Sequence, residues 1–191
     1  RAAEAAARDS YGRLLAFLAA RTRDIAAAED ALAEAFAAAL HAWPVDGVPN
    51  NPPAWLLTVA RRALGHGARR AGLLAAAQPT LSLLQEERDE VTDSAIPDER
   101  LKLMFICAHP AINAGSRAPL MLQTVLGLDA ARIAAAFLVS PTSMGQRLVR
   151  AKAKIRDAGI AFAVPEAADL PARLDAVLEA IYAAYGSGWE D

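Results

Sequence analysis

The sequence lacks several features that would place it outside the cell or in a membrane. It contains one cysteine, Cys107, so no disulfide can form within the chain, which favours a reducing compartment. No run reaches the roughly 18 consecutive apolar residues of a membrane span. The first ten residues, RAAEAAARDS, carry charges throughout and do not resemble a secretion signal. They also lack a starting methionine, so we expect the chain to begin after the true N-terminus of a cytoplasmic protein.

The sequence is also poor in aromatic residues, at 6%, and in the alternating Val, Ile and Thr runs that mark strands. Hydrophobic residues make up 54% of the chain, and many of them are alanine, which favours helices. The 191 residues allow one domain or two small ones. We therefore predict an all-α protein.

The net charge of −2 conceals alternating blocks. Residues 1–70 have a net charge of +2 and residues 71–128 one of −3. Residues 129–159 hold six Lys/Arg and two Asp/Glu, whereas residues 160–191 hold one and six. Such blocks suggest segments with different partners, although ordinary surface variation is the alternative.

The first block, residues 1–70, reads as a helical domain of three helices. Tyr11, Leu14, Leu15 and Leu18 share one face at spacings of three and four. A second apolar stripe comprises Leu32, Phe36, Leu40 and Trp43. Pro44 is expected to end that helix because proline removes a helical donor. A loop over 45–53 and a third helix after Pro52 and Pro53 complete the domain.

Residues 71–96 have the mixed, acidic composition of a linker, and residues 97–159 form a second helical block. Its predicted helices cover 98–108, with Leu101, Phe105 and Ala108 in register, then 116–127, 129–138 and 141–157. A final helix over 170–185 lies in an acidic segment, residues 160–191.

The helices at 129–138 and 141–157 are joined by a short turn, as in a helix-turn-helix. Ser140 is a suitable N-cap and Pro141 suits the first helical position. The buried stripe is predicted to comprise Met144, Leu148, Ala151 and Ile155. The DNA-binding face is then predicted to comprise Thr142, Ser143, Gln146, Arg147, Arg150 and Lys154. From the pattern alone, a solvated helix pair in a bundle is an equal alternative.

Three motifs resemble the extracytoplasmic-function (ECF) sigma factors of RNA polymerase. IAAAFLVSPTSMGQRLVRAKAKIRDAG, residues 133–159, resembles their region four. AAAEDALAEAFAAALHAW, residues 26–43, and NPPAWLLTVARRAL, residues 51–64, resemble their region two. LPARLDAVLEAIYAAY, with LKLMFICAHPAI, resembles a subgroup that carries a helical extension after region four. The resemblance implies that the protein binds core RNA polymerase and promoter DNA and helps to open the promoter.

Each functional site that the resemblance implies could instead be an ordinary structural feature of a helical protein. Glu29, Asp30 and Glu34 are predicted to form an acidic patch that contacts polymerase, and the alternative is a solvated helix face. The minus-ten element would be contacted by the loop and the helix after it. The predicted residues there are Asn50, Asn51, Trp55, Arg61, Arg62, Arg69 and Arg70. A proline-rich turn and a core tryptophan are the alternatives at this site.

The sequence departs from the family at several positions. Ala33 stands where the family usually has Gln. Gly65 and His66 stand where the family usually has Ile-Asp, which weakens that helix. Leu138 replaces a glycine common in the turn of region four, so the turn must accept a side chain, through an altered bend. The extension is too short for the helix pairs of the subgroup, which predicts that the chain is a fragment.

Catalysis, cofactors and metal binding are not expected. Cys107 and His109 point to different sides of a helix, and His41 and His66 are isolated. We expect control by an anti-sigma factor, or by the acidic segment folding against residues 141–157. The alternatives are a helix-turn-helix regulator that acts without polymerase and a degenerate scaffold that binds only protein.

Overall fold

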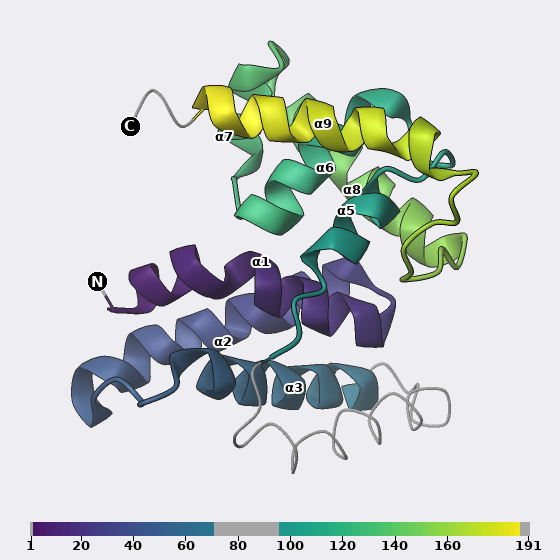
Figure 1. The fold of residues 1–191 in the computed structure, drawn as a ribbon. Helices are drawn as coiled ribbons and strands as arrows, with labels where there is room; N and C mark the ends of the chain where they lie inside the picture. Colours follow the sequence, from purple (N-terminus) through teal and green to yellow (C-terminus); the bar gives the residue numbers. More distant parts are fainter. Residues whose placement is uncertain (1, 71–95, 188–191) are drawn as a thin grey trace. The chain divides into compact units, whose positions relative to one another are not determined.

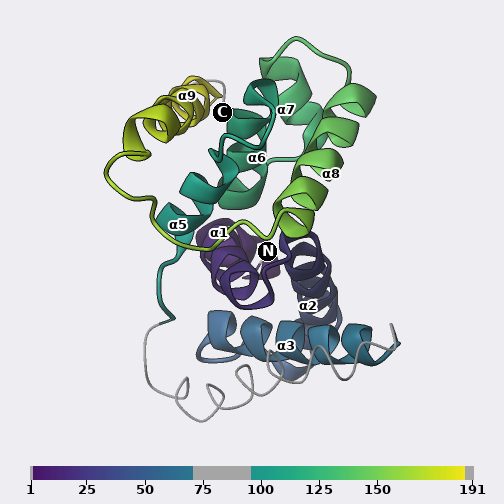
Figure 2. The same cartoon turned by 90° about the vertical axis from the view of Figure 1, so that its right-hand side faces the viewer.

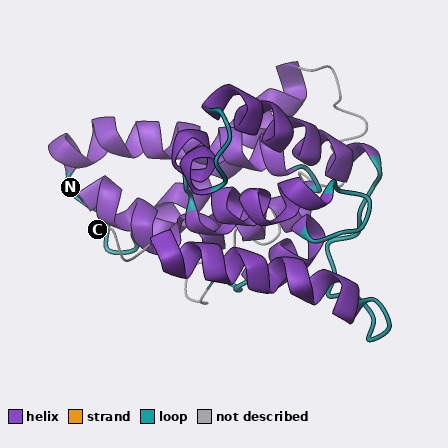
Figure 3. Cartoon of the chain, turned by 90° about the horizontal axis from the view of Figure 1, so that it is seen from above, coloured by secondary structure: helices purple, strands orange, loops and turns teal. Residues whose placement is uncertain are grey.

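The computed structural model describes residues 2–70 and 96–187, and these residues form helices and loops without a strand (Figure 3). This confirms the all-α prediction. The backbone contacts divide the chain into two compact units, residues 1–98 and 99–191. The predicted linker, residues 71–96, lies outside the described residues except for Ile96.

The first unit contains α1 (Ala2–Thr22), α2 (Ile25–Asp46) and α3 (Pro52–Arg70) (Figure 1). Helix α2 packs against both of the others. The predicted inner face of α1 is confirmed, because Leu14, Leu15 and Leu18 are fully buried. The large side chains at the centre of this unit are Leu14, Leu15, Phe17, Leu18, Ile25, Leu32, Leu56 and Leu57.

Helix α2 differs from the prediction in two respects. It continues through Pro44, because a proline in the last turn forfeits only the bond to the Leu40 carbonyl. Gly47 closes the helix by donating its N–H to the Trp43 carbonyl at 3.1 Å. Leu40 is 62% exposed, so the predicted stripe was wrong there. Leu32 and Trp43 of the predicted stripe are buried, and the rest of the buried face consists of Ile25 and four alanines: Ala28, Ala31, Ala35 and Ala39.

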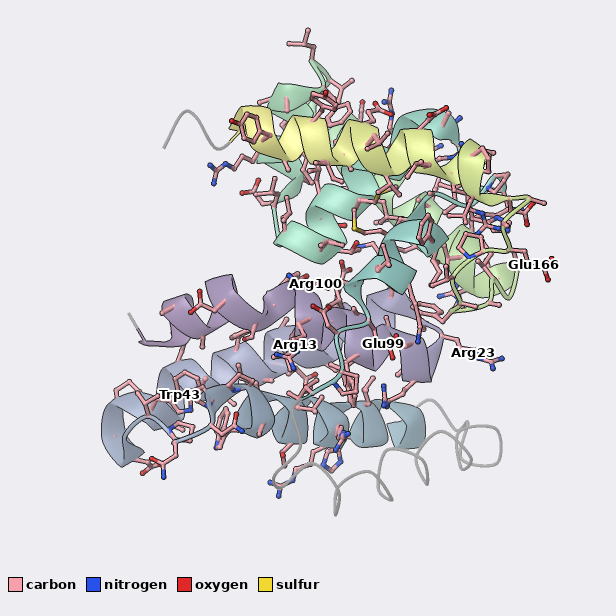
Figure 4. All side chains as sticks on the ribbon, viewed as in Figure 1. Arg13, Arg23, Trp43, Glu99, Arg100 and Glu166 are labelled. Carbon is pink, nitrogen blue, oxygen red and sulfur yellow. The ribbon has the colours of Figure 1, made fainter. Side chains whose placement is uncertain are left out.

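Helix α3 begins at a capped end and keeps its form through both glycines. The Asn51 Oδ1 accepts a hydrogen bond from the Ala54 N–H at 3.2 Å, which satisfies a free donor of the first turn. The helix passes Gly65 and Gly67 and ends at Arg70. Beyond the undescribed residues, the Ile96 carbonyl accepts hydrogen bonds from Arg13 of α1, one of them at 2.8 Å (Figure 4).

The second unit is organised around α6 (Ala114–Leu126), which contacts α5 (Arg100–Cys107), α7 (Ala130–Ala136), α8 (Pro141–Asp157) and α9 (Leu170–Ser187). Figure 2 shows α6 between α8 and α9. Gly127, in the left-handed conformation with φ 71°, ends α6. Leu101 was wrongly assigned to the core and is 55% exposed. Phe105 and Ala108 of the predicted register are buried, and Leu103, Ile106 and Cys107 complete the buried face.

The turn between α7 and α8 is fixed by hydrogen bonds at both ends. Leu138 has φ 52°, and its N–H and that of Val139 donate to the carbonyls of Ala135 and Ala134. This is a Schellman motif with leucine at the position that usually holds glycine. The predicted altered bend is therefore absent: the turn keeps its usual left-handed conformation with a leucine whose side chain is 93% exposed.

The start of α8 matches the prediction. The Ser140 Oγ accepts a hydrogen bond from the Ser143 N–H at 3.2 Å, and Pro141 occupies the first turn. The predicted buried stripe is confirmed, since its four members are at most 5% exposed: Met144, Leu148, Ala151 and Ile155. The opposite side of α8 is thereby turned to solvent.

Candidate functional site

The exposed side of α8 forms one wall of a cavity of about 450 Å³. Arg147, Arg150 and Lys154 line this cavity from α8, together with Ala151 of the buried stripe. Ile112, Asn113 and Ser116 line it from the start of α6. We call this cavity the basic pocket. Three cations within one cavity suit an anion such as a phosphate group.

The backbone at the start of α6 adds to this positive character. The Asn113 Oδ1 accepts a hydrogen bond from the Gly115 N–H at 3.1 Å and caps the helix. The Nε of Arg117 donates to the Ile112 carbonyl at 3.0 Å and holds the preceding segment in place. A helix N-terminus carries partial positive charge, so it favours an anion beside it. Sequence reasoning missed Asn113 and Ser116, although an asparagine just before an apolar helix is a recognisable cap.

The remaining polar and basic residues of α8 either face solvent or make hydrogen bonds within the second unit. Thr142 and Gln146 are exposed near the helix start, where side chains can extend outward. Ser143 is exposed, but its hydroxyl is 2.8 Å from the Ser140 Oγ, which engages it in the cap. Lys152 belongs to the same basic block, yet its Nζ donates to the Gln123 Oε1 of α6 at 3.1 Å. Lys152 therefore braces α8 on α6.

The predicted acidic patch on α2 contains two exposed carboxylates rather than three. Asp30 and Glu34 lie one turn apart and are both exposed. Glu29 is half-buried and close enough to Tyr11 of α1 to influence its hydroxyl. Burial, and then the charge of Glu29, raise the pKa of Tyr11. Glu29 was thus wrongly grouped, because a step of one residue turns a helix by about 100°.

Two of the predicted minus-ten residues near the connection between α2 and α3 are accessible to solvent: Asn50 fully and Trp55 in part. Asn50 is exposed, whereas the Asn51 side chain is engaged in capping α3. Trp55 is half-buried, and its ring meets that of Trp43 edge to face at 5.5 Å. The Nε1 of Trp43 is buried without a hydrogen-bond partner among the described residues. This part of the predicted site therefore combines an exposed amide with a partly covered aromatic pair.

The predicted arginines of α3 do not form one surface. Arg61 turns inward, with its guanidinium carbon 5.5 Å from the centre of the Phe17 ring. Arg62 is exposed. The side chains of Arg69 and Arg70 lie outside the described residues. Arg61 therefore packs on the core of the first unit, and Arg62 is the described arginine on α3 that faces solvent.

As far as it is described, up to residue 187, the acidic C-terminal segment does not cover α8 as predicted. Within the described residues, α9 packs against α6 and α5 and leaves Arg150 and Lys154 exposed. Its buried residues, Ala176, Val177 and Ala180, are small apolar side chains that fit against α6. The masking hypothesis is therefore wrong for α9, which buries its apolar residues against α6 and α5 and not against α8.

The cysteine and the histidine that were considered for catalysis or metal binding lie within or beside helix α5. The residues that the structure describes contain no cluster of three or more His, Cys, Asp or Glu that could hold a metal ion. Cys107 is fully buried, with its Sγ 3.7 Å from the Thr124 Oγ1. The Nδ1 of His109 accepts a hydrogen bond from the Ala111 N–H at 3.1 Å. None of the described helices is long and apolar enough to cross a membrane.

The first unit is similar to a known protein family. Residues 7–73 match the family model of Sigma-70 region 2, a span that runs from within α1 past the end of α3. The first unit is thus similar to Sigma-70 region 2. The chain is also 39% identical, over 173 residues, to an uncharacterized protein of Rhizobium meliloti (strain 1021).

That alignment covers 87% of this chain but 41% of the relative, so the chain spans less than half of the length of the protein that it resembles. No solved structure gave a significant match.

Proposed function

We propose that this chain is the promoter-recognition part of an ECF-type sigma factor. The observation that supports this most is the match of residues 7–73 to Sigma-70 region 2, which coincides with the three packed helices of the first unit. In this proposal, residues 1–70 are region two, 71–96 a linker and 97–159 region four. Residues 160–191 begin a C-terminal extension. The protein binds polymerase and DNA in the cytoplasm and catalyses no reaction itself.

The first unit makes the polymerase contact and part of the promoter contact. Asp30 and Glu34 are exposed one turn apart and suit a basic surface on a polymerase subunit. Asn50 offers an amide to a base edge of the minus-ten element, beside Trp55. Arg62, together with Arg69 and Arg70, contacts the DNA backbone. Asn51 and Arg61 act indirectly, because one caps α3 and the other packs on Phe17.

The second unit reads the minus-thirty-five element as a helix-turn-helix, with α8 in the major groove. Gln146 and Arg147 carry the side chains best able to read base edges. Arg150 and Lys154 hold backbone phosphates at the basic pocket. The pocket explains how a chain of net charge −2 can hold a polyanion. Its three cations and a helix N-terminus concentrate positive potential at one place.

The polymerase contact is tested by a pull-down with core RNA polymerase. We expect Asp30→Ala/Glu34→Ala to bind several-fold more weakly than wild type. The matched control is Asp9→Ala/Asp46→Ala, which removes the same charge from exposed positions of α1 and α2. The control should bind as wild type does. Equal binding by both double variants would contradict the role of the acidic patch.

The same experiment separates the runner-up function. The basic pocket lies wholly in the second unit, so a helix-turn-helix regulator could use it without polymerase. If wild type bound DNA but failed to bind polymerase, that regulator would replace the sigma factor as the best reading.

A further inference from the structure

The three cations of the basic pocket have no carboxylate partner in the part of the chain that the structure describes. Arg150 donates through its Nε to the Gln146 carbonyl of its own helix at 3.2 Å, which leaves the far end of the guanidinium available. Arg147 and Lys154 make no hydrogen bond or ion pair with another described residue. By contrast, Arg156 of the same helix pairs with the carboxylate that follows it, at 2.9 Å. The pocket therefore carries positive charge that the described protein does not neutralise.

Ser116 brings a buried hydroxyl to the same pocket. It lines the cavity from the first turn of α6, and only 5% of its surface is exposed. Its N–H donates to the Asn113 carbonyl at 2.9 Å. Among the residues that the structure describes, none makes a hydrogen bond with its hydroxyl. Since buried hydroxyls normally have a partner, Ser116 indicates a hydrogen-bonding group that comes from outside the chain.

The pocket has the size of a small-molecule site. Its volume of about 450 Å³ lies within the range of roughly 300–1,000 Å³ that is typical of such sites. Ile112 and Ala151 are buried and supply an apolar part of its lining, beside which the organic part of a ligand can lie. Arg147 and Lys154 are two turns apart, about 10 Å along the helix. This spacing suits a ligand with more than one charged group.

The chemistry of the lining favours phosphate. None of the described residues that line the pocket is acidic, so an anion meets no like charge there. Guanidinium groups bind phosphate oxygens in pairs, and a hydroxyl at a helix N-terminus adds a donor beside free amides. A ligand with a single negative charge would leave most of the positive charge uncompensated, whereas a diphosphate group carries several.

We propose that the basic pocket binds the diphosphate group of a small molecule, and that this ligand excludes DNA from α8. Arg147 and Arg150 line the pocket and also belong to the predicted DNA-binding face, so they cannot serve both ligands at once. The bound diphosphate also places negative charge where the DNA backbone would lie. The exclusion of DNA rests on the proposed function of the second unit, whereas the binding of the small ligand does not.

The binding is tested by isothermal titration calorimetry on the whole 191-residue chain. The probe is inorganic pyrophosphate, and citrate is the matched anion, because both are small polyanions but citrate presents carboxylates. The titrations are made at physiological ionic strength, which screens exposed charges, and without divalent cations. Pyrophosphate should bind about fivefold more tightly than citrate, since its oxygens suit the forked donors of the arginines.

Two single variants locate the binding in the pocket. Ser116→Ala should weaken pyrophosphate binding about threefold, through the loss of one hydrogen bond. Its thermal unfolding should not fall below that of wild type, because the hydroxyl has no described partner to lose. Lys154→Ala should weaken pyrophosphate binding about fivefold or more. Arg156→Ala removes the same charge from α8 outside the pocket and should bind pyrophosphate as wild type does.

Competition with DNA is measured by fluorescence anisotropy of a labelled duplex at constant ionic strength. Pyrophosphate at about ten times its Kd should weaken DNA binding about tenfold, as simple competition requires. Citrate at the same concentration, with its fivefold weaker binding, should weaken it about threefold.

Equal binding of pyrophosphate and citrate, or unchanged pyrophosphate binding by either Ser116→Ala or Lys154→Ala, would overturn the phosphate site. Pyrophosphate that bound through these residues without weakening DNA binding would overturn the exclusion. A chain that bound pyrophosphate in this way but supported no transcription with core polymerase would keep the phosphate site and lose the sigma-factor proposal. The two failures are therefore distinguishable.

Discussion

The left-handed Leu138 in the turn before α8 allows a quantitative prediction about stability. Its φ of 52° brings the Cβ of an L residue close to the following carbonyl, at a cost of about 1–2 kcal/mol. Leu138→Gly removes that cost. It also increases the conformational entropy of the unfolded chain, which lowers the unfolding free energy by about 0.4–1 kcal/mol. The 93% exposed side chain contributes little burial to lose. We therefore expect a net gain in unfolding free energy of about 0.5–1 kcal/mol.

The assay is urea unfolding followed by far-UV circular dichroism, with amide exchange in α7 and α8 to locate the gain. In thermal unfolding, the same gain corresponds to roughly 3–6 °C for a unit of this size. Leu138→Ala is the matched control, because it removes most of the side chain but keeps the Cβ. It should stay within about 0.5 kcal/mol of wild type. If alanine stabilised as much as glycine, the exposed apolar surface and not the backbone would be the cause, and the reasoning would be refuted.

Three further predictions concern the cap of α3, the basic pocket and the buried phenol. Asn51→Ala should lower the unfolding free energy by about 1 kcal/mol, measured by urea unfolding, while Asn51→Asp keeps the cap. Arg150→Ala and Lys154→Ala should each reduce the slope of log affinity for DNA against log salt by about 0.9, whereas Arg156→Ala, beside Asp157 and outside the pocket, should change it less. The pKa of Tyr11 is raised above its ordinary 10.0, so the neutral phenol stabilises the fold below that pH, and this stability is lost as pH rises further. Tyr11→Phe should therefore lose less unfolding free energy than wild type between about pH 10 and 11, where the unfolded tyrosine ionises.

Local chemistry made much of the fold predictable from the sequence. Ser140 and Pro141 indicate the start of α8. The spacing of its four apolar residues predicts its buried side: Met144, Leu148, Ala151 and Ile155. Once that side is known, Arg147, Arg150 and Lys154 must face outward. These predictions depend on neighbours within one or two turns, which a single sequence records directly.

The errors arose where a distant element decided the outcome. Leu40 and Leu101 look like core residues, but alanines and other apolar positions supply the contacts with neighbouring helices, and both leucines remain exposed. Arg61 looks like a DNA contact until Phe17 is placed beneath it. The position of α9 depends on its fit to α6, which no local pattern in residues 160–191 indicates.

The candidate site likewise combines residues that local sequence patterns indicate with residues that only the packing of distant elements brings together. The basic residues of α8 could be chosen from the sequence, whereas Asn113 and Ser116 come from a separate helix and enter the pocket only through packing. Asn51 could be recognised as polar and near a helix start, but its role as a cap required the 3.2 Å bond to Ala54. The basic residues of the pocket could thus be predicted from the sequence, whereas the residues at the start of α6 that line it could not.

Transcription in vitro with core RNA polymerase tests the central proposal most directly. Purified chain, core polymerase and a library of promoter fragments are combined, and transcripts are mapped at their start sites. We predict transcripts from a defined subset of promoters that require the chain. Arg147→Ala should reduce discrimination among them, and Asp30→Ala/Glu34→Ala should lower all of them together. Transcripts that are the same with and without the chain would contradict the sigma-factor assignment.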